Sequence, residues 1–393
     1  MKRISILGST GSIGVNALKV IGANPGRYRV QYLSAGRNAD LLTEQALKLK
    51  PAAVAIADNT KTTMLEQALK PQGIAVLSGK AGILELASRT DVDLVLNAIV
   101  GTAGLEPSIR ALNAGKDLAL SNKESLVMAG EVINRLLAEK KLRLFPIDSE
   151  HSAIWQCLIG ESPNNIRKLI LTGSGGPFRT LPIEQFMKIT PEQALRHPTW
   201  NMGRKITVDS ATMMNKGLEI IEAHWLFLVP PDKIEVVIHP QSIIHSMVEF
   251  IDGSIKAQLG LPDMKLPIQY ALSYPDRFPV SWENTDLAEI GTLTFEAPDV
   301  KKFPALRLAR EALQRGGTAP AILNVVNEFA VYAFLEKQIT FPDIPALVEK
   351  ALATLSIVDN PALPDILTAE QSSRKFVERY VSELKQTKGI NPT

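Results

Sequence analysis

The segment RISILGSTGSIG, residues 3–14, decides the fold at the start of the chain. Its apolar residues predict a buried strand, and glycines then follow at positions 8, 11 and 14. Glycines after a strand let backbone amides approach a pyrophosphate, which also lies at the N-terminus of the next helix. Their spacing of three and three departs from the commoner G-x-G-x-x-G pattern. Alone, the segment fits a dinucleotide site and an ordinary strand–helix turn equally well.

The rest of the first third alternates apolar runs with helical patterns. Further strands are expected at residues 30–33, 53–56, 74–77, 94–99, 117–120 and 144–147. Such alternation predicts an α/β fold with a parallel, doubly wound sheet that binds ligands at the carboxyl ends of its strands. One of these ends carries Arg37, where enzymes that prefer NAD usually have an acidic residue. A positive charge there suits the 2′-phosphate of NADP, although Asp40 lies close enough to leave NAD open.

Polar residues also follow the last two of these strands. Lys123 and Glu124 come after the strand at 117–120, and they could equally be a solvated pair that opens a helix. Asp148 and Glu150 follow the strand at 144–147. In extended backbone, two residues that are two apart share a face, as two metal ligands must. The competing interpretation is a strand end that caps the next helix.

The segment SATMMNKGLE, residues 210–219, combines groups that suit a phosphate and a metal. We expect a helix that opens near Ser210, where backbone amides and a hydroxyl could bind phosphate. Asn215, Lys216 and Glu219 would share one face of this helix. Lys216 could neutralise the phosphate and Glu219 could reach a metal. Carboxylates without a thiolate cluster favour a hard divalent cation, so the segment predicts a phosphorylated substrate at a metal-assisted site.

The middle of the chain predicts loops and a second sheet. A strand at 168–172 ends in the loop GSGGPFR, and residues 182–204, with His197 and Trp200, have a weak pattern that suits a lid over a reaction site. Trp200 could cover a substrate or belong to the core. Strands at 234–238, 243–250 and 254–259 predict a second, partly antiparallel sheet and a candidate dimer surface. The turn Asp252-Gly253 suggests a hairpin, and Met264, a few residues further on, is expected to lean over the site.

Composition narrows the class of protein. The 393 residues are enough for two or three domains, and a net charge of +2 gives no sign of nucleic acid or a membrane surface as a bulk partner. The single cysteine, Cys157, rules out disulfides within the chain and a thiolate metal cage. No apolar run reaches the roughly 18 residues that a membrane span needs. Because the chain begins with a strand rather than a leader pattern, we expect a cytoplasmic protein.

Taken together, these segments resemble a known family. The similarity covers residues 8–14, 122–125, 148–151, 171–178, 202–205, 208–219, 239–242 and 262–264. In all of them the chain is similar to 1-deoxy-D-xylulose 5-phosphate reductoisomerase, and the run VDSATMMNKG at 208–217 is highly specific.

The resemblance implies an NADP-dependent oxidoreductase of non-mevalonate isoprenoid biosynthesis, which also needs Mg²⁺ or Mn²⁺, with Co²⁺ possible. Such enzymes rearrange 1-deoxy-D-xylulose 5-phosphate and reduce the product to 2-C-methyl-D-erythritol 4-phosphate. We favour a retro-aldol route over a concerted ketol shift. The family is homodimeric, and the resemblance implies a nucleotide domain at 1–147, a connective catalytic domain at 148–275, a linker at 276–290 and a helical domain at 291–393.

The resemblance also implies roles for individual residues. The metal would be held by Asp148, Glu150 and Glu219, with Lys123 near the reacting hydroxyls. The substrate would contact Ser149, Ser174, His197, Trp200, Ser210, Asn215, Lys216 and Met264. NADPH would be lined by Thr10, Gly11, Ser12, Ile13, Gly36, Arg37, Asn38, Asn122, Glu124 and Gly203. Lysine is common in the family at position 37, and arginine keeps its positive charge.

Two other functions remain open from the residues alone. A metal-dependent phosphosugar isomerase that binds the dinucleotide only structurally would rearrange its substrate without consuming NADPH. A regulatory protein that binds NADP without turnover would keep its ligand binding when Asp148 is replaced by alanine.

Overall fold

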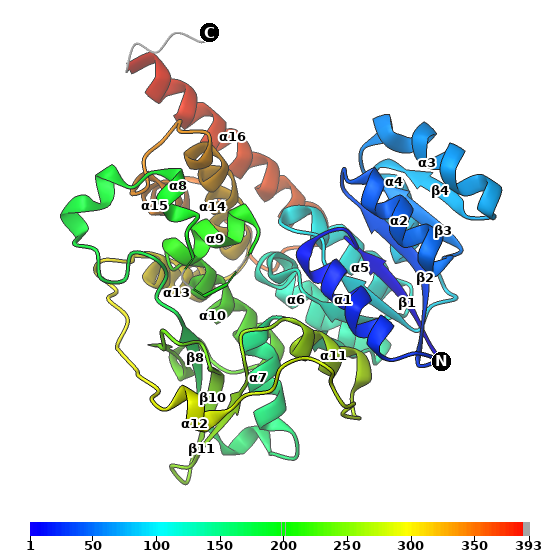
Figure 1. The fold of residues 1–393 in the computed structure, drawn as a ribbon. Helices are drawn as coiled ribbons and strands as arrows, with labels where there is room; N and C mark the ends of the chain where they lie inside the picture. The colour runs from blue at the N-terminus through cyan, green and yellow to red at the C-terminus, as the bar shows by residue number, and fades with distance from the viewer. Residues whose placement is uncertain (198, 201, 388–393) are drawn as a thin grey trace. The chain divides into compact units, whose positions relative to one another are not determined.

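The computed structural model describes residues 1–197, 199–200 and 202–387, and it divides into two compact units (Figure 1). Unit 1 comprises residues 1–125, 133–152 and 263–283, and unit 2 comprises residues 126–132, 153–262 and 284–393. No helix in the described part of the chain is long and apolar enough to cross a membrane.

Unit 1 is built on a seven-stranded parallel sheet in the order β4-β3-β2-β1-β5-β6-β7 (Figure 1). Its strands are β1 Lys2–Leu7, β2 Tyr28–Ala35, β3 Ala53–Ile56, β4 Ala75–Ser78, β5 Leu94–Asn97, β6 Asp117–Leu120 and β7 Leu144–Pro146. The central strands are continuous apolar runs because helices cover both faces of a parallel sheet. Ile4, Ile6 and Leu7 of β1, for example, are fully buried. The predicted doubly wound sheet is confirmed.

Helices connect these strands. They are α1 Ser12–Ala23, α2 Ala39–Leu49, α3 Thr62–Leu69, α4 Gly79–Ala87, α5 Leu105–Asn113, α6 Lys123–Lys140 and α7 Ser149–Leu158, and α11 Lys265–Ser273 returns late in the chain. Residues of α6 and of α7 belong to both units. α11 packs on α1, where the amide of Asn24 donates to Gln269 at 3.4 Å.

Unit 2 contains the predicted second sheet, in the order β11-β10-β8-β9. Its strands are β8 Ile166–Gly173, β9 Ile234–Ile238, β10 Ile244–Phe250 and β11 Ile255–Leu259. β8 pairs with β9 in parallel and with β10 antiparallel, and the turn at Asp252-Gly253 joins the antiparallel strands β10 and β11. The partly antiparallel sheet and its hairpin are therefore confirmed.

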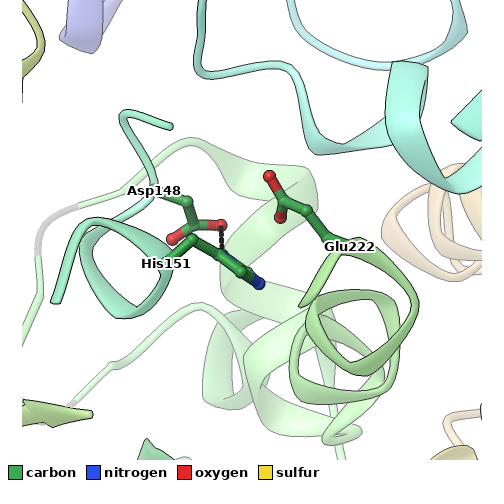
Figure 2. Close-up of side chains that lie close together, drawn as sticks. All are labelled: Asp148, His151 and Glu222. Atoms are coloured by element: carbon green, nitrogen blue, oxygen red, sulfur yellow. Dashed lines mark ion pairs between the residues drawn. The ribbon is translucent and has the colours of Figure 1, made fainter. Parts of the chain in front are cut away.

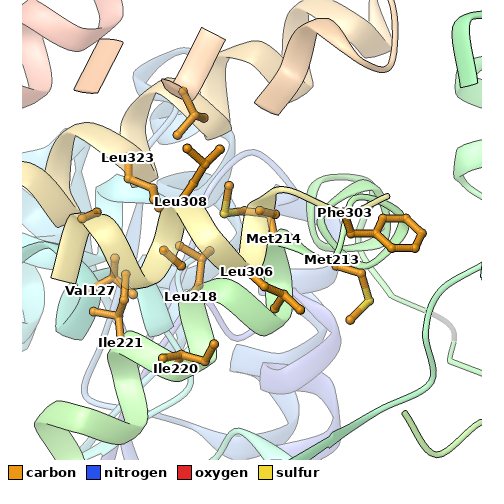
Figure 3. Close-up of a cluster of buried hydrophobic side chains, with 14 of the residues drawn as sticks. Val127, Met213, Met214, Leu218, Ile220, Ile221, Phe303, Leu306, Leu308 and Leu323 are labelled. Carbon is orange, nitrogen blue, oxygen red and sulfur yellow. The ribbon is translucent and has the colours of Figure 1, made fainter. Parts of the chain in front are cut away.

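Seven helices that lie wholly within the described part of unit 2 contribute to one large apolar core. They are α8 Pro191–Ala194, α9 Arg204–Ala211, α10 Met214–Phe227, α13 Ala305–Arg315, α14 Ala319–Leu335, α15 Asp343–Thr354 and α16 Leu363–Thr387. The short helix α12 Leu287–Ile290 has no buried residue. Figure 3 shows part of this core, where Leu218 and Ile221 of α10 gather with Leu306 of α13 and Leu323 of α14. The helical character predicted for the last part of the chain is confirmed. Helix α10, which carries Asn215, Lys216 and Glu219, is thus anchored in the core of unit 2.

Candidate functional site

The strand order of unit 1 reverses between β1 and β5, and open α/β sheets bind nucleotides at such a switch point. Gly8 directly follows β1 and has φ = +85°, and a Cβ there would lie 2.7 Å from the carbonyl oxygen of Ala98, just beyond the end of β5. Only glycine allows this close approach. The switch point therefore depends on the glycine segment identified in the sequence.

The residues predicted to line a dinucleotide gather at this edge. Thr10, Gly11, Ser12 and Ile13 connect β1 to the N-terminus of α1, and Gly11 and Ser12 are exposed there. β1 pairs with β2, so Gly36, Arg37 and Asn38 come at the same edge of the sheet, also exposed. Asn38 also caps α2, because its Oδ1 accepts from the amide of Leu41 at 3.1 Å.

Asn122 and Glu124 lie after β6, and Asn122 is almost completely buried. The side-chain amide of Asn122 donates to the carbonyl oxygens of Ile99 and Gly101, both at 2.8 Å, and to Glu124 Oε2 at 3.0 Å. The structure thus gives Asn122 a structural task, since it ties the loop after β5 to the start of α6.

Lys123 and Asp148 form a buried ion pair in unit 1, with Nζ and Oδ2 2.6 Å apart. β6 and β7 are neighbouring strands, so the segments that come after them meet at one edge. Figure 2 shows the His151 ring beside the Asp148 carboxylate, with Nδ1 3.8 Å from Oδ2. Buried charges are stable only when they are paired and hydrogen-bonded. The pairing of Lys123 with Asp148 therefore allows both charges to be buried here.

The local backbone at Asp148 differs from our expectation. We placed Asp148 and Glu150 on extended backbone, whereas α7 begins at Ser149 and puts Glu150 in its first turn. The backbone amide of Ser152 donates to the carbonyl oxygen of Asp148 at 2.8 Å, so Asp148, just before the helix, accepts a hydrogen bond from its first turn. The Ser149 hydroxyl donates to Glu150 Oε2 at 2.6 Å. Extended geometry was therefore the wrong reason for grouping these carboxylates.

In unit 2 the glycine loop after β8 brings several predicted substrate residues together. The Ser174 hydroxyl lies 3.1 Å from Nε2 of His197 and accepts from the amide of Gly176 at 3.2 Å. A Cβ on Gly176, whose φ is +68°, would lie 2.6 Å from the carbonyl oxygen of Ser210. A Cβ on Gly173 would lie 2.9 Å from Cε of Lys216. A hydroxyl, an imidazole, a carbonyl oxygen and an ammonium group thus lie around one loop.

The tautomer of His197 is set by its partners. Its Nδ1 accepts from the backbone amides of Thr199 at 3.1 Å and Trp200 at 2.9 Å. The proton of the neutral ring therefore lies on Nε2, which points to Ser174. Burial lowers the pKa of His197 below its usual value, because desolvation disfavours the charged form. The ring is thus a neutral hydrogen-bond donor to the loop near neutral pH.

The segment around Ser210 corrects another expectation. We predicted a helix that opens near Ser210, but Ser210 lies in the last turn of α9, and α10 begins only at Met214. Met213 between them has φ = +62°, which separates the helices. Ser210 therefore cannot offer the N-terminal amides of a helix. Its carbonyl oxygen lies against Gly176 of the glycine loop.

On α10 the three predicted polar residues do share a face. Glu219 is completely buried, and its Oε1 accepts from the Asn215 amide at 2.6 Å, while Lys216 Nζ forms an ion pair with its other oxygen. These contacts hold a carboxylate and an ammonium side by side inside unit 2. The arrangement can present a cation to a phosphate and a carboxylate to a metal.

Three predicted residues remain, namely Trp200, Met264 and Gly203. Trp200 is half-buried, and its ring lies 6.3 Å from that of His245. Met264 precedes α11 in unit 1 and is half-buried, and Gly203 is the exposed N-cap of α9. Their predicted contacts with substrate or cofactor stay predictions.

The donor set suits a hard divalent cation. Within unit 1, Asp148 and Glu150 offer carboxylate oxygens, which Mg²⁺ and Mn²⁺ prefer, and Glu219 offers the same kind of donor within unit 2. Sequence reasoning gave no role to His151 or to Glu222, a buried acid on α10 that Figure 2 also labels. Helical spacing was the available signal, because His151 lies three residues after Asp148 and Glu222 three after Glu219.

A doubly wound sheet with an open glycine loop at its switch point defines a dinucleotide-binding oxidoreductase as the class of protein. Comparison with known proteins narrows this class. Three family models match the chain: 1-deoxy-D-xylulose 5-phosphate reductoisomerase at residues 4–130, its C-terminal domain at 144–227, and the DXP reductoisomerase C-terminal domain at 259–376.

Individual relatives agree with these models. 1-deoxy-D-xylulose 5-phosphate reductoisomerase from Chloroherpeton thalassium is 51% identical over 377 residues, 96% of this chain and 97% of the relative. The enzyme of that name from Bacteroides fragilis is 50% identical over 97% of this chain and 98% of its own length.

Two solved structures have the same fold. One is the reductoisomerase from Zymomonas mobilis in complex with NADPH, with a TM-score of 0.91 and 42% identity, covering 97% of this chain and 99% of that one. The other is a DOX-P reductoisomerase with NADPH, fosmidomycin and magnesium, with a TM-score of 0.93 and 41% identity, covering 98% of this chain and 100% of that one. The chain belongs to the 1-deoxy-D-xylulose 5-phosphate reductoisomerase family, and the resemblance seen in the sequence is confirmed.

Proposed function

We propose that this chain converts 1-deoxy-D-xylulose 5-phosphate to 2-C-methyl-D-erythritol 4-phosphate, using NADPH and Mg²⁺ or Mn²⁺. The observation that carries the proposal is the gathering of Ser174, His197, Ser210 and Lys216 around one glycine loop. This cluster lies in a chain half identical to enzymes of that name. It offers hydroxyls and a cation to a phosphate, as the substrate requires.

The phosphate end of the substrate is held by unit 2. Lys216 neutralises charge, and Ser174, Ser210 and Asn215 supply hydrogen bonds. Neutral His197 donates through Nε2 to the loop or to the substrate. Binding energy from a group remote from the reacting carbons serves to position those carbons.

The reacting end is held by carboxylates and Lys123. Asp148, Glu150 and Glu219 would hold the divalent cation. When bound, the cation supplies Lewis-acid polarisation of adjacent substrate oxygens, and NADPH supplies the reducing equivalents. Lys123, which is paired with Asp148, donates hydrogen bonds to the substrate hydroxyls, where Ser149 also makes contact. The segment at 182–204 with Trp200, together with Met264, is proposed to exclude water.

The activity assay measures NADPH absorbance with 1-deoxy-D-xylulose 5-phosphate, with and without added Mg²⁺ or Mn²⁺. We expect metal-dependent oxidation and a product with the mass and NMR spectrum of 2-C-methyl-D-erythritol 4-phosphate. Rearranged product without NADPH oxidation would instead identify an isomerase. Ligand binding without turnover of either kind would identify a regulatory protein.

We propose that NADPH occupies the switch point of unit 1, with Arg37 facing its 2′-phosphate. The remaining contacts would come from Thr10, Gly11, Ser12, Ile13, Gly36, Asn38, Asn122, Glu124 and Gly203.

Replacing Arg37 with alanine should weaken NADPH binding roughly tenfold, as expected for the loss of hydrogen bonds between charged groups, and leave NADH binding nearly unchanged. Arg29→Ala is the matched control, because Arg29 is exposed at the opposite end of the same strand, β2. Isothermal titration with both nucleotides provides the measurement. Equal losses for NADPH and NADH would remove Arg37 from the 2′-phosphate.

We propose that the chain forms a homodimer through the edge strand β11. β11 is an edge strand, and exposed apolar side chains occur on it and just before it, at Ile251, Ile255 and Leu259. Natural proteins seldom leave such an edge uncovered. Sedimentation equilibrium should give a dimer for the wild type. Ile255→Lys should shift it toward monomer, whereas Val358→Lys, at another exposed apolar residue, should not. A dimer unaffected by Ile255→Lys would place the interface elsewhere.

The domain organisation and location complete the proposal. The nucleotide domain would span residues 1–147, the connective catalytic domain 148–275, the linker 276–290 and the helical domain 291–393. A cytoplasmic location is supported by the low cysteine content, because the sequence has a single cysteine, Cys157, and its side chain is buried. Burial raises the pKa of its thiol to about 11, which suits an unreactive core residue.

A further inference from the structure

A buried polar contact joins α9 to α14 inside unit 2. Lys205 Nζ lies 2.9 Å from Asp209 Oδ2, one turn further along α9. The other carboxylate oxygen of Asp209 accepts from the side-chain amide of Asn327 on α14 at 2.7 Å. All three residues are at most 5% exposed. A carboxylate that accepts from an ammonium and an amide is thus enclosed between two helices.

The surroundings make this contact unusual. Apart from Asn324, Asn327 and Glu328, the buried residues of α14 are apolar, and the helix contributes Leu323 to the core in Figure 3. Apolar side chains of similar size would pack there without the desolvation cost of two charges. Hydrogen bonds have directions and fixed lengths, whereas apolar contacts tolerate sliding. The contact therefore fixes the position of α9 on α14 more narrowly than core packing alone.

The position of α9 matters because Ser210, a predicted substrate residue, comes directly after Asp209. The carbonyl oxygen of Ser210 lies against Gly176 of the glycine loop. The Asp209 carbonyl also accepts from the hydroxyl of Thr212, whose Oγ1 in turn accepts from the amide of Met214 at the start of α10. A shift of Asp209 would thus be transmitted to Ser210 and to the start of the helix that carries Lys216.

We propose that Lys205, Asp209 and Asn327 are positioning residues that hold the phosphate-binding segment in register with the glycine loop. The inference rests on the proposed function for the identity of the substrate. The helical region then takes part in substrate affinity, because Asn327 acts on the phosphate-binding segment through Asp209, which lies 118 positions earlier in the chain.

The test compares Asn327→Leu with Asn324→Leu. Asn324 lies one turn earlier on α14, is also completely buried, and makes no side-chain hydrogen bond within the described part of the chain. Both variants replace a buried amide with an apolar group of similar size, so they share any general effect on packing. Only Asn327→Leu removes the donor to Asp209. Asp209→Asn, which keeps the size of the side chain and removes its charge, is a second variant.

Steady-state kinetics should show a KM for 1-deoxy-D-xylulose 5-phosphate raised roughly 3- to 30-fold in Asn327→Leu, in line with coupling through a packed network. The kcat and the KM for NADPH should stay within about twofold of the wild type, because none of the three residues is proposed to bind the metal or NADPH. The KM for 1-deoxy-D-xylulose 5-phosphate should also rise in Asp209→Asn, and in Asn324→Leu it should equal that of the wild type. The kinetics are measured at a temperature at which circular dichroism shows every variant to be folded.

Binding of inorganic phosphate to the metal-free protein, measured by titration calorimetry, separates this inference from the proposed function. Phosphate affinity should fall in Asn327→Leu and Asp209→Asn but not in Asn324→Leu, even if the wild type showed no turnover. Equal phosphate affinities and equal KM values in Asn327→Leu and Asn324→Leu would overturn the inference. So would a loss confined to kcat, or a matching rise in the KM for NADPH.

Discussion

Replacing Lys216 with methionine is expected to lower kcat/KM for 1-deoxy-D-xylulose 5-phosphate about 10²- to 10³-fold, mainly through KM. The Lys216 side chain is 5% exposed and reaches the glycine loop near Gly173. Removing one partner of a buried charge pair costs far more than removing an exposed one, because the other charge is left desolvated and unpaired. Methionine keeps most of the stem, so the loss reports the ammonium group.

Lys233→Met is the matched control, since Lys233 is an exposed lysine of the same unit and should leave KM unchanged. Steady-state kinetics with varied substrate at saturating NADPH gives the comparison. A KM equal to that of the wild type would remove Lys216 from the phosphate site. A fall in kcat alone would instead place Lys216 near the reacting carbons.

Replacing Glu150 with glutamine is expected to lower kcat at least about 10³-fold. The substitution keeps the size of the side chain and its place in the first turn of α7, but it removes the negative charge. A carboxamide is a weaker ligand for a hard cation than a carboxylate. Lewis-acid stabilisation by a metal ion contributes several kcal/mol, and each tenfold in rate corresponds to about 1.4 kcal/mol.

NADPH binding should survive in Glu150→Gln, because the unit 1 segments proposed to bind the nucleotide come after β1, β2 and β6 rather than after β7. Glu139→Gln, at an exposed position on α6, should behave as the wild type. Activity in Glu150→Gln that is restored by high metal concentration would support a weakened site. Activity independent of both the substitution and the metal would exclude Glu150 as a ligand.

Much of the fold could be predicted from the sequence because its two sheets have different patterns. Strands buried on both faces, such as Ala53–Ile56, appear as continuous apolar runs. The second sheet was recognisable from its hairpin turn at Asp252-Gly253. Each signal is local, so it survives without knowledge of tertiary contacts.

The helix boundaries near the site were less predictable. Ile206, Thr207 and Val208 are β-branched and disfavour helix, so we expected the helix to open near Ser210. Burial in unit 2 overrides this weak propensity and α9 begins at Arg204. The i, i+4 pair of Lys205 and Asp209 was the available sign.

For the site, too, some groupings of residues could be predicted from the sequence and others could not. The segment at 210–219 already grouped Ser210 with Lys216 as phosphate-binding residues. The resemblance added Ser174 and His197, and the structure places all four around one loop. The contact of Asp209 with Asn327 has no local signature at all, because a buried amide on an apolar helix gives no indication of its partner.

Mn²⁺ binding to the metal-free protein, monitored by electron paramagnetic resonance, tests most directly whether the three carboxylates hold the metal. We expect one tight Mn²⁺ per chain in the wild type. We also expect a large loss of Mn²⁺ affinity in Asp148→Asn, Glu150→Gln and Glu219→Gln, while NADPH binding to each variant stays normal. Wild-type Mn²⁺ affinity in all three folded variants would contradict the assignment of these carboxylates as the metal site.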